Sequence, residues 1–166
     1  CNVVFVDNAF YTIYIGHCQR EVHLSANRLT NITKDSTKGL RCVARLYLSR
    51  NRIRFIEEGS FISLPLLVNI DLKNNSISSI EDRSLDSRGL EYTDLRFNRI
   101  TNISAHLFQN TNTMELYLSA NQLGDLPDDL FLGVKRLFLL DISKNQLTKI
   151  NNKFFKKAQS LCFLLP

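Results

Sequence analysis

The sequence predicts an α/β solenoid, a right-handed horseshoe with a parallel β-sheet on its concave side, an irregular or 3₁₀-rich convex side, and an N-terminal β-hairpin cap. Three observations lead to this prediction. An asparagine recurs six times at spacings of 23 or 24 residues, each copy follows a short run of alternating apolar residues, and residues 1–18 lie outside this period. Periods of about 20–50 residues indicate stacked units that bury their apolar faces only against their neighbours.

The repeated phrase is clearest in L-Y-L-S-R-N-R-I, residues 46–53. Its asparagine sets the register, and the six copies are Asn27, Asn51, Asn75, Asn98, Asn121 and Asn145. The pattern L-x-x-L-x-L-x-x-N-x-L fits three copies well, whereas Gln19, Thr93 and Thr113 each replace an apolar residue in another copy. We expect the alternating apolar residues to point inward from a short strand, and each asparagine side chain to bond to the backbone of neighbouring turns.

Two further apolar columns keep the same register. The first stands five residues after each asparagine and consists of Ile32, Ile56, Ile80, Ile103, Leu126 and Ile150. The second follows five residues later and consists of Phe61, Leu85, Phe108, Phe131 and Phe155. This second column helps to explain why a chain with no Trp has 11 Phe, and we expect it to fill the convex side of the core.

Length and composition are those of one ordinary folded domain, with 166 residues, 44% hydrophobic and 22% charged. No apolar run approaches the ~18–20 residues of a membrane span. The strand motif restarts at Leu161, 24 residues after Leu137, and the chain ends without a polar cap. We therefore expect a cap at 1–18 and repeats over 19–166, six full and the start of a seventh, with the C-terminal cap absent as in a fragment of a longer array.

The segment before the repeats predicts a hairpin. Two β-rich runs, Val3–Val6 and Tyr11–Ile15, flank the turn-forming pair Asp7 and Asn8. Such a hairpin would cover the exposed edge of the first turn, as the terminal unit of a stack must do.

Two disulfide pairings are open. A hairpin near Asn8 brings Cys1 close to Cys18, so a Cys1–Cys18 bond is the first choice. A Cys18–Cys42 bond is the alternative, because these residues occupy the same place in successive repeats, where neighbouring strands lie about 4.8 Å apart. Cys162 falls at a solvent-facing position and is either free or paired outside this chain segment.

Three N-x-S/T sequences make Asn31, Asn74 and Asn102 candidate glycosylation sites. Asn31 and Asn102 share a position just outside the strand, where a glycan would extend into solvent. Asn74 lies at the edge of the concave face, where a glycan would obstruct binding. Together with the cysteines near the cap, these sites favour an extracellular chain, secreted or part of a receptor ectodomain.

Residues 123–147, L-G-D-L-P-D-D-L-F-L-G-V-K-R-L-F-L-L-D-I-S-K-N-Q-L, carry a family resemblance. They resemble the "typical" extracellular leucine-rich repeat subfamily, which includes Toll ectodomains, insect leucine-rich immune proteins, small proteoglycans and neuronal adhesion proteins. The opening C-N-V-V-F-V-D and the hairpin after it are most similar to the caps of mosquito leucine-rich immune proteins. This resemblance implies a recognition module of invertebrate innate immunity.

The sequence does not predict an enzyme. The three histidines are scattered, and no nucleophile or phosphate-binding motif is present. Asp71, Asp94 and Asp141 share one column, and we expect them to be charged residues on a solvated sheet face. No Cys-x-x-Cys spacing or Cys/His cluster suggests a metal, and no cofactor is expected.

Function in a solenoid generally resides on the concave sheet. The outward positions of the fourth to sixth copies predict an aromatic and apolar patch, formed by Tyr92, Phe97, Met114, Tyr117, Phe138 and Leu139. Such a composition is enriched at protein interfaces and predicts a protein partner. The alternative is that further C-terminal repeats cover part of this patch.

A basic area is predicted on the first two strands, where Arg20, Arg45 and Arg50 face outward beside Tyr47. With a formal net charge of +5, this area would attract a sulfated glycan or an anionic microbial surface, and the alternative is a solvated basic surface without a ligand. Nucleic acid is not expected, because the other lysines lie off the concave face and no stacking platform accompanies the arginines.

These observations predict an extracellular protein-binding recognition module. The competing hypothesis is a structural adhesion or matrix-binding protein, and a cytosolic enzyme regulator with reduced cysteines and unused glycosylation sites ranks third.

Overall fold

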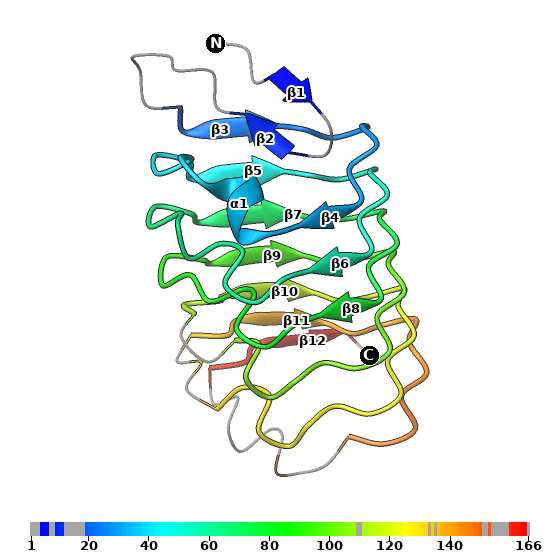
Figure 1. The fold of residues 1–166 in the computed structure, drawn as a ribbon. Helices are drawn as coiled ribbons and strands as arrows, with labels where there is room; N and C mark the ends of the chain where they lie inside the picture. Colours follow the sequence, from blue (N-terminus) through cyan, green and yellow to red (C-terminus); the bar gives the residue numbers. More distant parts are fainter. Residues whose placement is uncertain are drawn as a thin grey trace.

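The computed structural model describes residues 4–6, 9–11, 19–108, 111–132, 134, 136–150, 153 and 160–165. The chain winds into a solenoid in which each turn adds one strand to a parallel sheet (Figure 1). The strands of this sheet are β3 (Glu21–His23), β5 (Arg45–Tyr47), β7 (Asn69–Asp71), β9 (Tyr92–Asp94), β10 (Glu115–Tyr117), β11 (Leu139–Asp141) and β12 (Phe163–Leu165). They are hydrogen-bonded in chain order, so the predicted solenoid is confirmed.

In this parallel sheet the central residue of each strand points into the core. Leu46, Ile70 and Leu116 are completely buried, and they lie at the same level as Thr93, which is also buried. Since successive side chains of a strand point to opposite faces, the two residues that flank each central residue lie on the concave face. The strand register therefore places one pair of outward side chains per turn, directly above the pair of the next turn.

The convex columns fill the core from the other side, as predicted. Phe61, Leu85, Phe108 and Phe131 are buried, with 2% of their surface exposed or less, and the rings of Phe108 and Phe131 lie 6.3 Å apart. Phe155, the last member predicted for this column, lies outside the described residues.

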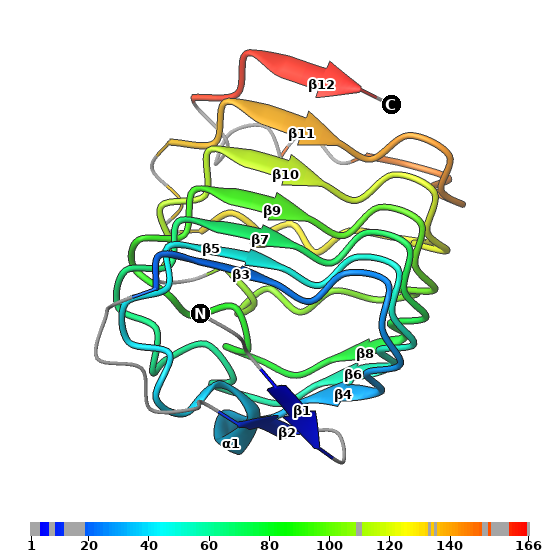
Figure 2. The ribbon, with the colours of Figure 1, turned by 90° about the horizontal axis from the view of Figure 1, so that it is seen from above.

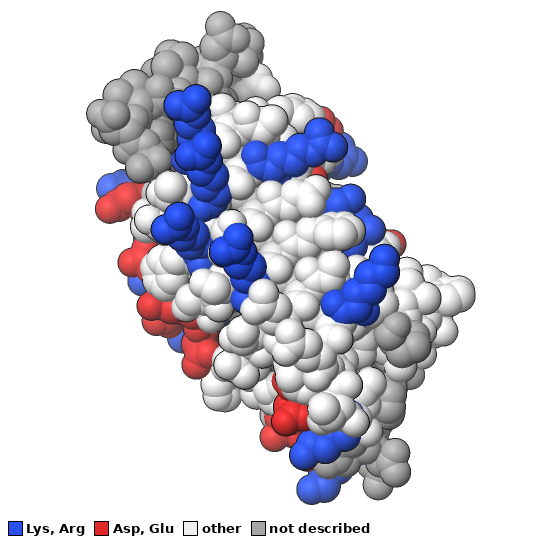
Figure 3. Space-filling view, turned by 90° about the vertical axis from the view of Figure 1, so that its right-hand side faces the viewer, with Lys and Arg blue, Asp and Glu red and all other residues white. Residues whose placement is uncertain are grey.

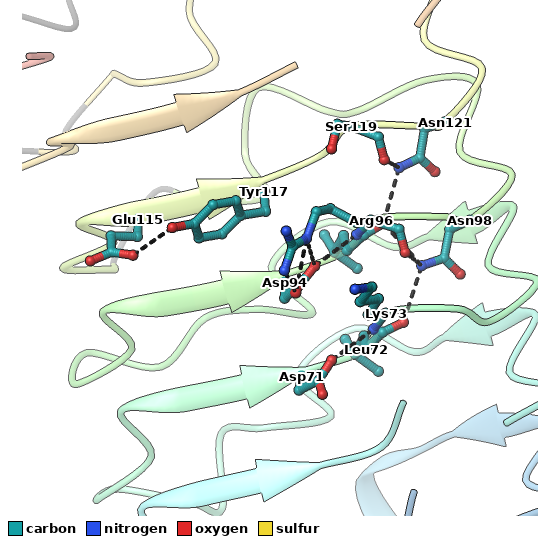
Figure 4. Close-up of polar contacts among 11 residues, drawn as sticks. Asp71, Leu72, Lys73, Asp94, Arg96, Asn98, Glu115, Tyr117, Ser119 and Asn121 are labelled. Atoms are coloured by element: carbon teal, nitrogen blue, oxygen red, sulfur yellow. Dashed lines mark hydrogen bonds and ion pairs between the residues drawn. The ribbon is translucent and has the colours of Figure 1, made fainter. Parts of the chain in front are cut away.

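The asparagine column forms the predicted ladder inside the turns that follow the strands (Figure 4). The Asn98 amide donates to Leu72 O at 3.1 Å and to Leu95 O at 3.0 Å, while its Oδ1 accepts from Ile77 N at 2.9 Å. Asn51, Asn75, Asn121 and Asn145 make the same three kinds of bond. Each amide thus joins two successive turns and satisfies backbone groups that would otherwise be buried without a partner.

The turn before each asparagine needs a left-handed residue, which the sequence pattern did not reveal. Ala26, Arg50, Asn74, Phe97, Ala120 and Lys144 all have φ between 54° and 59°. None of them is glycine, and left-handed backbone costs an ordinary L-residue about 1–2 kcal/mol. Hydrogen bonds to the following turn hold it in place, among them Phe97 N to Ser119 O at 3.1 Å and Ala120 N to Ser143 O at 3.0 Å.

The convex side is mostly turns, with two ordered additions. A second parallel sheet joins β4 (Asn31–Ile32), β6 (Phe55–Ile56) and β8 (Ser79–Ile80) in the first three turns (Figure 2). A four-residue helix, α1 (Lys34–Thr37), begins with a capping box between Thr33 and Ser36. The described part of the convex side is irregular, as expected, but it contains no 3₁₀-helix, because single i+3 bonds such as Leu64 N to Phe61 O do not continue into a helix.

The N-terminal hairpin pairs β1 (Val4–Val6) with β2 (Ala9–Tyr11) in antiparallel fashion. The hairpin is confirmed, but its second strand begins two residues earlier than the predicted Tyr11. The reason is the register, since Val6 opposite Ala9 leaves a connection of only two residues. No helix in the described part of the chain is long and apolar enough to cross a membrane.

Candidate functional site on the concave sheet

The concave face carries two columns of outward side chains, one on each side of the buried central residue. Paired strands align Asn69, Tyr92, Glu115 and Leu139 in one column, and Asp71, Asp94, Tyr117 and Asp141 in the other. The cluster formed by Tyr92, Asp94, Arg96, Glu115 and Tyr117, here called the Tyr92–Tyr117 cluster, joins the two columns across β9 and β10. Figure 4 shows its members Asp94, Arg96, Glu115 and Tyr117.

Asp94 and Arg96 form the ionic part of this cluster. Arg96 Nη2 lies 2.6 Å from Asp94 Oδ2, and Arg96 Nε lies 2.9 Å from Asp94 Oδ1. The Asp94 side chain is 4% exposed and that of Arg96 is 29% exposed, so water screens this pair less than an ordinary surface pair. The hydrogen bonds to Asp94 raise the pKa of Arg96 further above its usual value, so the guanidinium stays charged.

Tyr117 lies under this guanidinium. Arg96 Cζ is 4.8 Å from the centre of the Tyr117 ring, within the range of a cation–π contact. The Tyr117 hydroxyl donates to Glu115 Oε2 at 2.8 Å, which fixes the ring from its other end. The Tyr92 ring lies 5.3 Å away at 46°. Two aromatic rings, one cation and two carboxylates are therefore held in one arrangement by contacts among themselves.

Burial changes the titration of both phenols. The pKa of Tyr117 is raised to about 12, mainly by burial and further by the hydrogen bond to Glu115. Burial also raises the pKa of Tyr92, with the Asp94 charge as the next cause. Both hydroxyls stay neutral near pH 7. The Tyr92 hydroxyl can donate to a partner or accept from it, whereas the Tyr117 hydroxyl already donates its proton to Glu115 and can accept.

The aspartate column closes the turns after the strands. Asp71 Oδ1 accepts from Lys73 N at 3.0 Å, and Asp94 Oδ1 and Asp141 Oδ1 accept from the N–H two residues ahead at 3.0 and 3.1 Å. Asp94 and Asp141 are only 3% and 7% exposed. The expectation of freely solvated carboxylates is therefore wrong for these two, because they serve as turn-closing acceptors.

The predicted aromatic and apolar patch is divided along the strands. Phe138 precedes β11 and is 42% exposed, with Met114 and Leu139 half-buried near it, and its ring contacts that of Phe163 at 5.1 Å. Phe97 lies at the opposite end of the strands, is 46% exposed, and has Lys73 Nζ 5.4 Å from its ring centre. Tyr92 and Tyr117 occupy the middle, so the six side chains extend along the face and do not form one compact apolar spot.

The predicted basic area on the first strands is neutralised at Arg45, whereas Arg20 and Arg50 are exposed and form no ion pair with a described residue. Arg45 Nη1 lies 2.5 Å from Glu21 Oε1 on the neighbouring strand, and the hydrogen bond to Arg45 lowers the pKa of Glu21. Tyr47 stacks on His23 with ring centres 4.5 Å apart. Arg50 lies beyond the strand in the left-handed turn, so the structure does not join it to Arg45 in one basic site.

The candidate modification sites differ in what the structure describes. Asn31, Asn74 and Asn102 are all exposed. Cys42 is disulfide-bonded and Cys162 is free and exposed. Cys1 and Cys18 lie outside the described residues, so both pairings stay predictions, and a bonded Cys42 favours Cys18–Cys42 over Cys1–Cys18.

Sequence reasoning missed Arg96, which holds the Tyr92–Tyr117 cluster together. It stands two residues after Asp94, in the turn, and not in an outward column of the strand. Within the described ranges, no three His, Cys, Asp or Glu side chains lie close enough together to hold a metal ion.

Comparison with known proteins decides the family. The profile of the leucine-rich repeat family matches residues 20–77 and 111–165, more than half of the chain. This chain belongs to the leucine-rich repeat family. As a leucine-rich repeat protein it has a fold that generally serves as a binding scaffold and not as an enzyme. A comparison with curated proteins gives no match.

Two solved structures agree with this family. The leucine-rich repeat domain of APL1, a mosquito protein, is 25% identical with a TM-score of 0.68, and the match covers 77% of this chain and 34% of that one. TLR13, solved as a complex with ssRNA13, is 22% identical with a TM-score of 0.61, covering 84% of this chain and 24% of that one. This chain thus spans about a third of the length of the APL1 domain and about a quarter of the length of TLR13. The predicted resemblance to mosquito immune and Toll-type proteins is confirmed.

Proposed function

We propose that this leucine-rich repeat chain is an extracellular recognition module that binds a protein partner on its concave sheet. The observation that carries the proposal is the Tyr92–Tyr117 cluster. Tyrosine and arginine are enriched among the residues that dominate binding energy at protein interfaces. Here they are half-buried and already ordered by mutual contacts, so a partner would lose little side-chain entropy when it binds them.

The arrangement also offers a mixed surface that suits a protein. Arg96 presents a charge next to two neutral phenols, and exposed apolar rings lie at both ends of the strands, with Phe97 at one end and Phe138 at the other. A partner could cover the apolar rings while it pairs with the polar groups between them.

Extracellular location is supported by two features. The glycosylation sequences at Asn31 and Asn102 are exposed, Cys42 is disulfide-bonded, and disulfides persist mainly in oxidising compartments. The resemblance to insect leucine-rich immune proteins and Toll ectodomains directs this proposal to innate-immune recognition, and the APL1 domain is one such neighbour.

A structural adhesion or matrix-binding role is the second candidate, and it would use an anionic glycan as partner. The formal net charge of +5 favours it. The two candidates differ in the residues they need, because a glycan partner would not depend on Tyr92 and Tyr117.

Capture of secreted proteins by matched variants tests the proposal. The concave variant is Tyr92→Ala with Tyr117→Ala, and the control is Ile62→Ala with Leu66→Ala, which removes side chains that are 64% and 51% exposed on the loop between β6 and β7. All three chains are immobilised at equal density, and the captured proteins are quantified by mass spectrometry.

We expect that the parent chain and the control both retain at least one protein, and that the concave variant retains this protein at least about tenfold less. The reason is that truncating two central interface residues typically costs more than about 2 kcal/mol of binding free energy. Equal retention of every captured protein by the two variants would exclude the concave site. The thermal midpoints of both variants are measured alongside, so that loss of fold is not mistaken for loss of binding.

A further inference from the structure

The side of the solenoid formed by the turns after the concave strands carries basic residues but no acidic ones. Its turns run from two residues before to three residues after each recurring asparagine, and these six segments, 25–30, 49–54, 73–78, 96–101, 119–124 and 143–148, are here called the turn edge. The turn edge contains 36 of the 166 residues and 8 of the 21 lysines and arginines, yet none of the 16 acidic residues. The overall charge of +5 therefore understates how positive this side is.

Most of these cations are free to meet a ligand. The exposed members are Arg28, Arg50, Arg52, Arg54, Arg99 and Lys144. None of these six side chains makes an ion pair or hydrogen bond with another described residue. The remaining two, Lys73 and Arg96, are half-buried and already contact Phe97 and Asp94.

The backbone fixes the spacing of the charges. Arg52 N donates to Leu29 O at 2.9 Å and Arg99 N donates to Ile77 O at 2.9 Å, and from Asn51 onward the residue after each asparagine is tied in this way to the previous turn. Successive turns of a parallel sheet lie about 4.8 Å apart. Side chains at equivalent positions thus follow a line along the solenoid axis. Figure 3 looks onto this side and shows basic side chains spread along it, with acidic side chains mainly toward the margins.

We propose that the turn edge binds a sulfated polysaccharide that lies along the solenoid axis. A linear polyanion with regularly spaced groups fits a row of exposed guanidinium groups, which bind oxyanions through paired N–H donors. Between the cations the edge carries short polar side chains, including Ser49, Ser78, Thr101, Gln122 and Gln146, that can bond to sugar hydroxyls.

Single-stranded nucleic acid fits this surface less well. Its bases need aromatic side chains on which to stack. Phe97 is the one aromatic residue among the 36 on the turn edge, and Lys73 already lies against its ring. The turn edge therefore has the cations of a single-stranded nucleic-acid site but lacks the aromatic side chains on which bases would stack.

The turn edge shares Arg96 and Phe97 with the proposed protein site, but the three arginines changed in the test below, Arg28, Arg52 and Arg99, lie outside that site, so either assignment can fail without the other. It also bears on glycosylation, because Asn74 stands on the turn edge and is exposed. An N-glycan on Asn74 would cover the exposed cations of the turn edge, so binding of the polysaccharide requires an unmodified Asn74. All proteins in the test therefore carry Ser76→Ala, which removes the glycosylation sequence and leaves Asn74 unmodified.

The test measures binding of heparin, a sulfated polysaccharide, to two charge-matched variants. The edge variant is Arg28→Ser, Arg52→Ser and Arg99→Ser, and the control is Arg41→Ser, Arg88→Ser and Arg136→Ser, three exposed arginines from turns that precede the strands. Both variants lose three positive charges, so they differ only in where the charge is removed. Titrations use heparin, chemically desulfated heparin and a single-stranded oligonucleotide of matched length.

We expect the edge variant to bind heparin at least about tenfold more weakly than the parent chain, and the control to change by less than about threefold, since only the edge charges contact the ligand. Desulfated heparin should bind far more weakly than heparin, and the Tyr92→Ala, Tyr117→Ala variant should keep heparin binding. Equal losses in the two arginine variants would show attraction by net charge alone and overturn the proposal. Tighter binding of the oligonucleotide than of heparin, lost in the edge variant, would overturn it in favour of nucleic acid.

Discussion

The asparagine column and the concave sheet lie a few residues apart in every turn, yet they differ in how uniform they are. From Asn51 to Asn145 each asparagine makes the same bonds to two neighbouring turns. On the concave face, by contrast, an exposed Glu21–Arg45 pair occupies the first strands and the half-buried Tyr92–Tyr117 cluster occupies the centre. The interior repeats because stacking requires it, whereas the exterior is free to vary and can carry recognition.

The largest expected effect separates buried from exposed members of the asparagine column. Asn98→Ala removes two donors and one acceptor that satisfy buried backbone groups, and we expect it to lower the free energy of unfolding by about 2–4 kcal/mol. Asn27→Ala is the matched control, because Asn27 is exposed and bonds only to carbonyls of its own turn among the described residues. It should cost about 0.5–1 kcal/mol in urea unfolding. Equal costs would contradict the ladder as the source of stability.

The next effect concerns the ion pair on the concave face. Asp94→Asn keeps an acceptor for the N–H two residues ahead but removes the charge that faces Arg96, and we expect a loss of about 1–2 kcal/mol. Asp71→Asn is the control in the same column, since the Asp71 carboxylate accepts from a backbone N–H and forms no described ion pair. It should change the unfolding free energy by less than about 0.5 kcal/mol. A similar cost for both would mean that the Asp94–Arg96 contact adds nothing.

A stabilising substitution is expected where the backbone is left-handed. Ala120 has φ of 56°, and Ala120→Gly should raise the free energy of unfolding by about 0.5–1 kcal/mol, because glycine adopts this conformation without a Cβ penalty. Ala44 does not have a positive φ, so Ala44→Gly should lower it by about 0.5–1 kcal/mol. If the turn stores strain, thermal unfolding will show a higher midpoint for Ala120→Gly and a lower midpoint for Ala44→Gly than for the parent chain.

The smallest effect appears only at high pH. The Tyr117 pKa of about 12 in the folded chain lies above that of an exposed tyrosine, so the folded state holds its proton longer than the unfolded state. The corresponding contribution to stability is complete below pH ~10 and is lost as the pH rises toward 12. A tyrosinate absorbance titration should show a late component that becomes smaller in Tyr117→Phe, because Tyr92 still titrates late there, and that keeps its size in Tyr47→Phe. A late component of unchanged size in Tyr117→Phe would contradict the assignment.

The sequence was sufficient for the strands of the concave sheet and for the buried columns, but not for the left-handed turn residues. The asparagine period predicted the strand register, the inward Leu46 and Ile70, and the buried Phe61 and Phe108 columns, because each signal recurs once per turn and the turns reinforce one another. The second sheet was not predicted, because its strands have only two residues each and the column that contains Ile32, Ile56 and Ile80 was interpreted simply as part of the core.

The candidate site was predicted in part. Tyr92 and Tyr117 were placed correctly on neighbouring strands, but Arg96 lies in a turn position that strand columns do not cover. Phe97 was expected beside the other aromatic residues, and the left-handed turn, which has no glycine to mark it, places it at the end of the face. The pairing of Glu21 with Arg45 could have been found, because both occupy the same outward column of adjacent strands.

Site-specific photocrosslinking tests the central claim, that the exterior of the concave sheet carries recognition. A photoreactive amino acid is placed at Tyr117 on β10 in one sample and at Leu66, an exposed residue of the loop between β6 and β7, in another. After irradiation in the presence of the secreted proteins, the leucine-rich repeat chain should form a covalent protein adduct at position 117 and none of comparable yield at position 66. Adducts at 66 alone, or in equal yield at both positions, would contradict the account.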